Sequence, residues 1–216
     1  MKKNTLDKIT EETKARYTER LNKYGYNIKT LGWGSEEQQS IRFNKFINSV
    51  NVAGKKLLDI GCGFGDLLDY CIVNNCMPAH YIGWDINSEL INIATQRHDT
   101  QTSKFETINL YELNETKITA DIAVMLGLLN FNLSGTCGNV DYSMMMIEKA
   151  FSCVKETLVV DFLSSHTDPN YEKEDFVFYH NPEEMLKFTL ELTPNVSLFH
   201  DYPPIPQKEF MLILNK

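Results

Sequence analysis

The sequence predicts an α/β protein with a doubly wound, mostly parallel sheet of seven strands, the last of them antiparallel. Three observations predict this fold. Strand-like and helix-like segments alternate through the centre of the chain, which is typical of parallel strands joined by crossover helices. Glycines follow the first of these strands directly. The last two strand-like segments are joined by a proline-rich connection too short for a crossover helix, so they should pair as antiparallel neighbours.

Length and composition narrow the class of protein. A chain of 216 residues, with 43% hydrophobic and 23% charged residues, suits one globular domain. The net charge of −8 argues against sequence-independent binding of nucleic acid, which depends on neutralising phosphates. No apolar run is long enough for a membrane helix, and no secretory signal is visible. Five cysteines without a CxxC pair favour reduced thiols and a cytoplasmic location.

The first 50 residues are predicted to form a helical cap. Residues 5–23 are polar with apolar side chains at helical spacing, which predicts a partly buried helix that could serve as a hinged cover. Ser35 is a candidate N-cap for a second helix ending near residue 49, and Gln38 fits a capping box. The residues of this helix expected to point inward are Ile41, Phe43, Phe46 and Ile47.

Residues 51–216 should form the sheet, and the whole chain should make one compact domain with the cap over the active-site edge. The predicted strands span residues 55–61, 81–86, 105–110, 120–126, 157–163, 196–200 and 210–214. The predicted helices among them span residues 67–73, 89–97, 142–154 and 182–192.

The most informative motif lies where the first strand ends. Gly61, Gly63 and Gly65 have the spacing G-x-G-x-G, which permits a sharp turn and close approach of a ligand to the backbone. A dinucleotide fingerprint has its third glycine one position later, and the Gly-Lys-Ser/Thr of a P-loop is absent. Asp85 stands where the second strand should end, and a carboxylate there can accept hydrogen bonds from both ribose hydroxyls of a nucleoside.

With Asp59 ahead of the glycines, this motif resembles that of the class I S-adenosylmethionine-dependent methyltransferases, and the resemblance extends over residues 55–216. It implies a Rossmann-like fold and S-adenosylmethionine as cofactor, with S-adenosylhomocysteine as product. It also implies that Asp85 binds ribose and that Asn109, where the family often has Asp, contacts adenine with Leu110. The cofactor-binding residues expected on this basis are Trp33, Arg42, Asp59, Gly61, Cys62, Gly63, Gly65, Asp85, Ile86, Asn109, Leu110 and Leu126.

Several of these residues also have an ordinary structural interpretation. Arg42 could pair with the carboxylate of the cofactor through its bidentate guanidinium, or it could serve helix packing or the surface. Trp33 could cover the cofactor or belong to the core. Asp85 could be the N-cap of the helix that follows it, and Asn109 an ordinary residue at a strand end. Cys62 is expected to be a small packing residue of the turn.

The segments outside the glycine motif are similar to those of small bacterial methyltransferases encoded among surface-polysaccharide genes. The similarity lies in Trp33-Gly34-Ser35, in residues 178–184 and in residues 200–203. It implies O-methylation of a small molecule of capsule or other surface-polysaccharide biosynthesis, on a sugar, nucleotide-linked or phosphate/phosphoramidate group. The alternatives are small-molecule N-methylation and a non-catalytic cofactor-binding partner subunit. We expect a monomer or homodimer that binds neither nucleic acid nor membrane.

Methyl transfer needs few catalytic residues, because the cofactor is already activated and the protein mainly aligns the reactants in a dry pocket. His166 is the first candidate for a base, since it follows the fifth strand at the ligand-binding edge of the sheet. His180, beside Tyr179, is the second candidate, and Asn130 could face the methyl donor. His200 is a weaker candidate, because its acidic neighbour on the strand should point to the opposite face.

The remaining sequence features are not expected to contribute a catalytic residue or a metal site. His80 and His98 are expected on the surface. No metal site is expected, because the acidic pair that metal-dependent methyltransferases place after the fourth and fifth strands is not evident. The segment after the fourth strand also lacks the Asp/Asn-Pro-Pro-aromatic run of nucleic-acid amino-methyltransferases.

Overall fold

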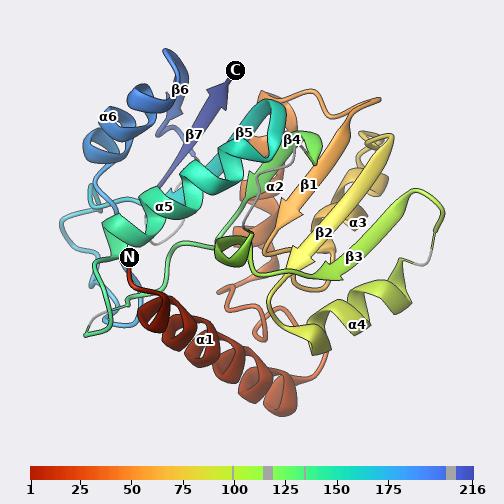
Figure 1. Cartoon of the computed structure of the whole chain (residues 1–216), viewed down its shortest axis with the longest axis horizontal. Coiled ribbons are helices and arrows are strands. Elements are labelled where there is room, and N and C mark those ends of the chain that lie inside the picture. Colours follow the sequence, from red (N-terminus) through yellow and green to blue (C-terminus); the bar gives the residue numbers. More distant parts are fainter. Residues whose placement is uncertain (99, 114–118, 134, 203–207) are drawn as a thin grey trace. The chain divides into compact units, whose positions relative to one another are not determined.

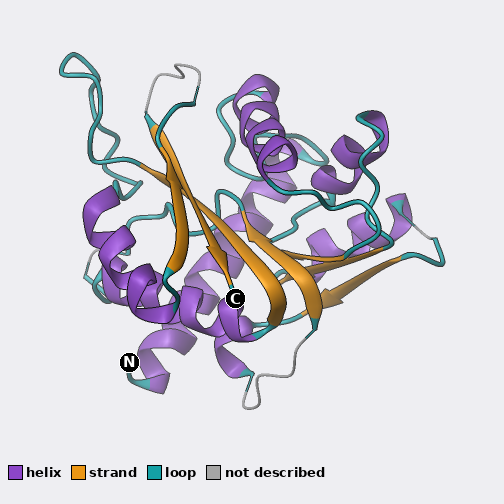
Figure 2. Cartoon of the chain, turned by 90° about the horizontal axis from the view of Figure 1, so that it is seen from above, coloured by secondary structure: helices purple, strands orange, loops and turns teal. Residues whose placement is uncertain are grey.

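The structure is a computed structural model that describes residues 1–216 apart from 99, 114–118, 134 and 203–207. Its strands form a seven-stranded sheet of order β3-β2-β1-β4-β5-β7-β6. Strand β7 is antiparallel to both β5 and β6. The predicted fold class, a mostly parallel sheet with helices and an antiparallel last strand, is therefore confirmed. Figure 2 distinguishes the strands from the helices by colour.

The described residues comprise two compact units, Met1–Leu113 and Asn114–Lys216. This boundary lies inside the predicted segment 51–216. The division into a cap over residues 1–50 and one main domain stays a prediction. Among the described helices, none combines the length and apolar composition that crossing a bilayer requires.

In its described part, the first unit contains three parallel strands and four α-helices. Strand β1 pairs in parallel with β2, and β2 pairs in parallel with β3, as Figure 1 shows. The register places Ile60 opposite Trp84 and Asp85 opposite Thr107, so the three carboxyl ends lie at one edge. The elements are α1 (Lys3–Tyr24), α2 (Glu36–Ser49), β1 (Lys56–Ile60), α3 (Asp66–Val73), β2 (His80–Asp85), α4 (Ser88–Arg97), β3 (Ser103–Thr107) and the 3-10 turn η1 (Leu110–Glu112).

The second unit contains four strands and two α-helices in its described part. Strand β4 pairs in parallel with β5, and the antiparallel β7 joins β5 to β6. Most of β5 and β7 is buried, which explains their nearly continuous apolar sequence. The elements are β4 (Ala120–Met125), α5 (Asn139–Ser152), β5 (Val154–Leu163), α6 (Pro182–Leu192), β6 (Asn195–Phe199) and β7 (Glu209–Asn215).

The start of α2 follows its predicted capping with one change. The Ser35 side chain accepts a hydrogen bond from the Gln38 backbone N–H at 3.2 Å, as expected of the N-cap. The Gln38 side-chain oxygen accepts from the N–H of Gly34, also at 3.2 Å, rather than from Ser35. The Gln38 side chain thus reaches one residue further back than in the standard capping box and fixes the chain entering the helix.

The inner face of α2 is rotated from the predicted one. Phe43 and Phe46 are buried as expected, but Ile41 and Ile47 are half-buried. The buried residues that complete the face are polar, Gln39 and Arg42. Hydrophobicity alone missed this arrangement, because long polar side chains can bury their stems when their polar ends find partners.

Three predicted elements each had one end misplaced by three residues. The helix predicted over residues 142–154 is α5, which begins at Asn139 and ends at Ser152. The Asn139 side chain donates to the Phe131 carbonyl at 2.5 Å, which secures the earlier start. Val154 is paired with Ala120 and begins β5, since strand pairing overrides the local helical pattern. The strand predicted over 105–110 runs from Ser103 to Thr107 instead.

The expectation that His98 lies on the surface was also wrong. His98 is 6% exposed rather than on the surface. Its ring stacks on Phe105, with ring centroids 5.5 Å apart, and its Nε2 lies 3.7 Å from a carboxylate oxygen of Asp69. Burial lowers the pKa of His98. His98 follows α4 directly as its C-cap, where the turn of the chain brings the ring inward.

Candidate cofactor and acceptor sites

The glycine turn connects β1 to α3 in the first unit. Gly61, Gly63 and Gly65 all have positive φ angles, at 82°, 54° and 79°, a region that favours glycine. The N–H groups of Gly61 and Cys62 both donate to the Trp84 carbonyl, at 2.7 and 3.0 Å, so the turn is anchored to β2. A Cβ atom added to Gly63 would lie 2.7 Å from Leu31 Cδ2, so there is little space for a side chain. The predicted backbone role of these glycines fits this geometry.

Asp85 joins the end of β2 to the glycine turn. Its Oδ2 accepts from the Gly63 N–H at 3.1 Å, and its Oδ1 accepts from the Asn87 N–H at 2.8 Å. Burial raises the pKa of Asp85, while these backbone hydrogen bonds act to lower it. The N-cap of α4 is Asn87, whose side chain accepts from the N–H groups of Glu89 and Leu90. The alternative that Asp85 is that N-cap is therefore wrong.

Asp59 lies deeper than Asp85. It is 5% exposed and accepts a 2.5 Å hydrogen bond from the Tyr81 hydroxyl. Burial raises the pKa of Asp59 to about 7. This geometry links β1 to β2 beneath the turn. Cys62 is also buried, and its thiol packs against Gly83 of β2. A Cβ atom added to Gly83 would lie only 2.8 Å from Cys62 Sγ, which fits the expected packing role of Cys62.

The residues after β2 and β3 contact α1. The Asn109 side-chain amide donates to Thr10 Oγ1 at 3.0 Å, and the Tyr111 hydroxyl donates to Asp7. Leu110 is buried and begins η1, while Ile86 is half-buried. The predicted adenine contacts thus lie at the carboxyl edge of the sheet, next to the first helix of the chain.

Trp33 and Arg42 come together from a loop and from α2. The guanidinium carbon of Arg42 lies 4.5 Å from the centre of a Trp33 ring, a cation–π contact. Arg42 Nη1 also donates to the Gln38 carbonyl at 2.9 Å. Arg42 is 3% exposed, so the surface alternative for it is wrong, and helix packing accounts for part of its contacts. Whether either residue contacts a cofactor stays a prediction.

Asp66 is a residue that sequence reasoning missed. It follows Gly65 as the first residue of α3 and receives a hydrogen bond from Arg97 Nη1 at 2.7 Å and from Gln39 Nε2 at 3.2 Å. Arg97 Nη1 also donates to the Phe64 carbonyl at 2.5 Å. These contacts tie α2, α4 and the glycine turn together. The signal that could have found Asp66 was its position, an acidic residue in the first turn of a helix.

In the second unit, the end of β4 is connected to β5. Gly127 has a φ of 70°, and its N–H donates to Asp161 Oδ1 at 2.6 Å. Leu126 is 7% exposed. The side-chain oxygen of Asn130 accepts from the Leu163 N–H at 2.9 Å. Asn130 thus has a structural contact, and its predicted position facing the methyl donor stays a prediction.

His166 and Glu183 form a pair at the carboxyl end of β5. His166 Nε2 lies 2.9 and 3.0 Å from the two carboxylate oxygens of Glu183, in the first turn of α6. Both side chains are exposed, 56% for His166 and 68% for Glu183. The hydrogen bond to His166 lowers the pKa of Glu183. Sequence reasoning missed Glu183, although Pro182-Glu183-Glu184 at a helix start is where carboxylates are favoured.

His200 lies beside His166, which the sequence analysis did not expect. The two ring centroids are 6.1 Å apart, and His200 Nε2 is 2.7 Å from Ser164 Oγ. The Ser164 hydroxyl in turn accepts from the His166 backbone N–H at 3.1 Å. His200, the weaker candidate for a base, therefore belongs to the same cluster as His166, the first candidate. The direction in which Asp201 points does not decide the role of His200.

His180 and Tyr179 are held by other side chains. His180 is fully buried, with Nε2 2.9 Å from Ser143 Oγ and its ring 4.6 Å from that of Phe162. Burial lowers the pKa of His180 to about 3. An imidazole with so low a pKa is a weak base at neutral pH, so these contacts favour a packing role. The Tyr179 hydroxyl accepts from the Glu174 N–H at 3.2 Å.

The comparisons with known proteins agree with this geometry. Residues 58–151 match a family described as a methyltransferase domain. Rv1506c of Mycobacterium tuberculosis, which is named as a methyltransferase, is 24% identical over 149 residues, 67% of this chain and 84% of that protein. A fatty-acid O-methyltransferase of Mycolicibacterium smegmatis is 38% identical over 55 residues. That match spans 26% of this chain and 20% of the enzyme, so the chain matches about a fifth of its length.

Solved structures share the fold over nearly the whole chain. Magnesium protoporphyrin IX methyltransferase (ChlM) from Synechocystis PCC 6803, with bound S-adenosylhomocysteine, is 15% identical, with a TM-score of 0.64. The match covers 98% of this chain and 99% of that one. The DhpI–SAM–HEP complex is 13% identical with a TM-score of 0.65, covering 99% of both chains. The chain therefore shares the fold of these methyltransferases, and the match of residues 58–151 together with these neighbours supports an S-adenosylmethionine-dependent methyltransferase.

Proposed function

We propose that this protein transfers a methyl group from S-adenosylmethionine to an oxygen of a small-molecule acceptor. The observation that carries the proposal is the glycine turn with Asp85 hydrogen-bonded to the Gly63 N–H. When bound, S-adenosylmethionine supplies an electrophilic methyl group on a positively charged sulfur. The chain itself binds the nucleoside, aligns the acceptor and excludes water.

The residues of the first unit suit the nucleoside part of this cofactor. Gly63 and Gly65 have positive φ angles, and the side chains of Leu31, His98 and Phe105 occupy the space that a Cβ on them would need. Glycine therefore keeps the turn in this conformation, and N–H groups at the start of the following helix suit a polar ligand. The Asp85 carboxylate has about four acceptor positions and accepts from the backbone N–H groups of Gly63, Asn87 and Ile86. Its remaining acceptor capacity suits a ribose hydroxyl. Asn109 and Leu110, with Ile86, are proposed to contact adenine.

We assign the role of general base to His166. The neighbouring carboxylate of Glu183 fixes the imidazole orientation, and the exposed ring can accept a proton from an acceptor hydroxyl. Glu183 is then a positioning residue, because it acts through His166. An acceptor that is already ionised, such as a phosphate oxygen, would not need this base.

A small-molecule acceptor is supported by the acidic composition of the chain. The net charge of −8 does not favour a polyanionic acceptor. Among structures with the same fold, one is named as a magnesium protoporphyrin IX methyltransferase and another as a small RNA methyltransferase, so the fold itself does not select the acceptor. The sequence resemblance favours a sugar, nucleotide-linked or phosphate-type intermediate of surface-polysaccharide biosynthesis, in the cytoplasm.

The test is formation of S-adenosylhomocysteine in the presence of sugar, nucleotide-linked and phosphate acceptors. With an acceptor in hand, His166→Ala should lower kcat by about 100-fold, and Glu183→Gln should lower it less, with S-adenosylhomocysteine affinity unchanged. His80→Ala, an exposed histidine of the first unit, is the matched control and should keep full activity. Full activity of His166→Ala would remove it as the base and favour an ionised acceptor. A wild-type protein that binds no S-adenosylhomocysteine would refute the proposed cofactor.

A further inference from the structure

The face of α1 that meets the sheet is defined by side-chain contacts from three of its turns. Asp7 accepts from the Tyr111 hydroxyl, and Thr10 Oγ1 accepts from the Asn109 amide at 3.0 Å. Further along the helix, Thr18 Oγ1 accepts from Asn87 Nδ2 at 3.1 Å. With 3.6 residues per turn, residues 7, 10, 14, 17 and 18 fall within an arc of about 100°. This face of α1 therefore covers the carboxyl ends of β2 and β3.

Tyr17 lies within that face, between the contacts that lead to Asp85. Asn87 Nδ2 is 3.1 Å from Thr18 Oγ1 and 3.4 Å from the Lys14 carbonyl. The same Asn87 donates its backbone N–H to the Asp85 carboxylate at 2.8 Å. Lys14 is one turn before Tyr17, and Thr18 is the next residue. Tyr17 therefore lies on α1 between two residues that contact Asn87, which is two positions beyond the predicted ribose ligand Asp85.

The electrostatics of Tyr17 agree with this placement. Burial raises the pKa of its hydroxyl to about 12, and the negative charge of Asp85 raises it further, against smaller opposing effects of Arg20 and Arg16. At neutral pH the phenol therefore keeps its proton and can donate a hydrogen bond.

We propose that Tyr17 is a cofactor-binding residue that forms the wall of the ribose site opposite Asp85, with its hydroxyl on a ribose oxygen. The proposal rests on the proposed function and adds to it. It makes α1 part of the cofactor site rather than a separate cap. Asp85 would accept from the ribose hydroxyls, while the phenol of Tyr17 both donates to a ribose oxygen and shields the carboxylate from water.

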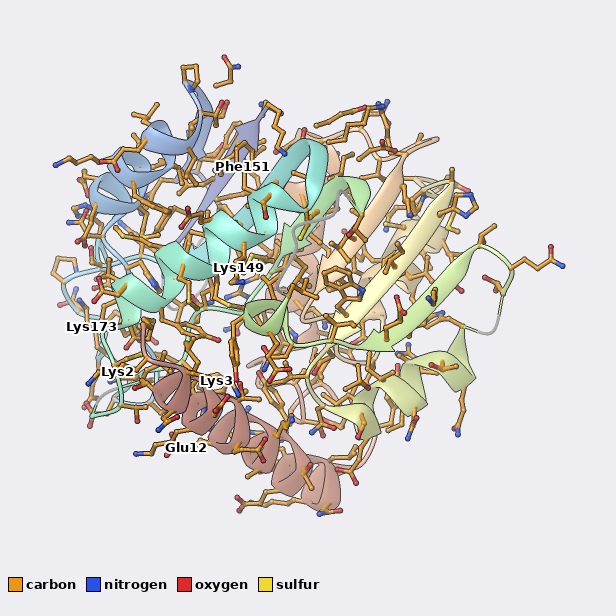
Figure 3. All side chains as sticks on the ribbon, viewed as in Figure 1. Lys2, Lys3, Glu12, Lys149, Phe151 and Lys173 are labelled. Atoms are coloured by element: carbon orange, nitrogen blue, oxygen red, sulfur yellow. The ribbon has the colours of Figure 1, made fainter. Side chains whose placement is uncertain are left out.

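The test compares S-adenosylhomocysteine affinity by calorimetry in the full-length protein and two variants of Tyr17. Tyr17→Phe removes one hydrogen bond and should raise Kd by about 3- to 10-fold. Tyr17→Ala also removes the ring and should raise Kd more than 10-fold. The matched control is Glu12→Ala on the outer side of α1, where Glu12, labelled in Figure 3, pairs with Lys8 at 3.6 Å. The control should keep the wild-type Kd.

The outcomes separate this inference from the proposed function. If the wild type binds S-adenosylhomocysteine and both Tyr17 variants bind within 1.5-fold of it, Tyr17 does not contact the cofactor and only this inference fails. If the wild type does not bind, the proposed function fails as well. Unfolding of each ligand-free variant is measured alongside, and a loss of affinity with an unchanged Tm supports a direct contact. Should Tyr17→Ala not fold, Tyr17→Phe decides the question.

Discussion

Asp85 is the residue on which the candidate cofactor site depends most directly. It holds the Gly63 N–H at 3.1 Å, so it both shapes the turn and presents a carboxylate at the end of β2. A hydrogen bond to a charged group contributes more than a neutral one, because the charged partner is costly to leave unpaired. The effect of losing Asp85 should therefore appear in ligand affinity first.

Asp85→Ala should weaken binding of S-adenosylhomocysteine by about 1–3 kcal/mol, which is roughly 5- to 150-fold in Kd. The physical reason is the loss of a charged acceptor for ribose together with the loss of support for the Gly63 backbone. Calorimetry measures the change, and Asp121→Ala on β4 is a control at a position outside the site. An unchanged Kd for Asp85→Ala would remove this carboxylate from the cofactor site.

The raised pKa of Asp59 predicts that the free energy of unfolding depends on pH. Its pKa is raised by burial to about 7, so the folded protein binds a proton more tightly than the unfolded chain does. The stabilisation is complete below the ordinary aspartate pKa near 4 and is lost as pH rises through about 7. Asp59→Asn keeps an acceptor for the Tyr81 hydroxyl but cannot ionise. The difference in unfolding free energy, variant minus wild type, should therefore grow between pH 4.5 and pH 7.5 and then level off. Denaturant unfolding at four pH values measures it, and a pH-independent difference would contradict the prediction.

At the scale of elements, α1 is the helix whose sequence is least apolar and whose position depends most on specific polar contacts. Its buried residues are few, Leu6, Ile9 and Thr10. Thr10 and Thr18 hold the helix by accepting hydrogen bonds from Asn109 and Asn87, which follow β3 and β2. Helices held by few apolar contacts open more readily than buried ones. The predicted hinged cover is therefore compatible with a helix that docks through side-chain hydrogen bonds.

Thr18→Val should loosen α1. The substitution keeps the shape of the side chain but removes the acceptor for Asn87 and the donor to Glu89, which lies 2.6 Å away. We expect amide hydrogen exchange in α1 to become about 5- to 10-fold faster, as the loss of roughly 1 kcal/mol predicts. Thr13→Val is the matched control on the same helix. Equal protection of α1 in the wild type and in Thr18→Val would show that other contacts hold the helix.

At the scale of the whole molecule, the fold and the domain match support the same class of ligand. A ligand that binds only the native state raises the free energy of unfolding with the logarithm of its concentration, once that concentration exceeds Kd. S-adenosylhomocysteine at 100 times its Kd should stabilise the protein by about 2.7 kcal/mol and raise Tm by a few degrees. NAD at the same concentration should not, because the G-x-G-x-G spacing differs from the dinucleotide fingerprint. Thermal unfolding with each ligand measures this, and equal shifts would refute the distinction.

The sequence by itself determined the α/β fold class, the glycine turn and the antiparallel pairing of the last two strands. These features depend on local patterns: alternation of apolar segments, glycines at fixed spacing, and a connection too short for a helix. Asp85 was also found in this way, because the end of β2 follows from the same periodicity. Local chemistry thus predicts where a cofactor can bind, since a turn with positive φ is encoded by neighbouring residues.

The tertiary structure decided which side chains meet. It paired His166 with Glu183, buried His180 and Arg42, and brought Thr18 of α1 against Asn87 after β2. None of these contacts is between neighbours in the sequence. Burial and pairing depend on how elements pack, and a histidine has the same letter whether its ring is exposed or enclosed. For this reason the sequence indicated a methyltransferase and a candidate base, while the carboxylate partner of that base became visible only from the packed structure.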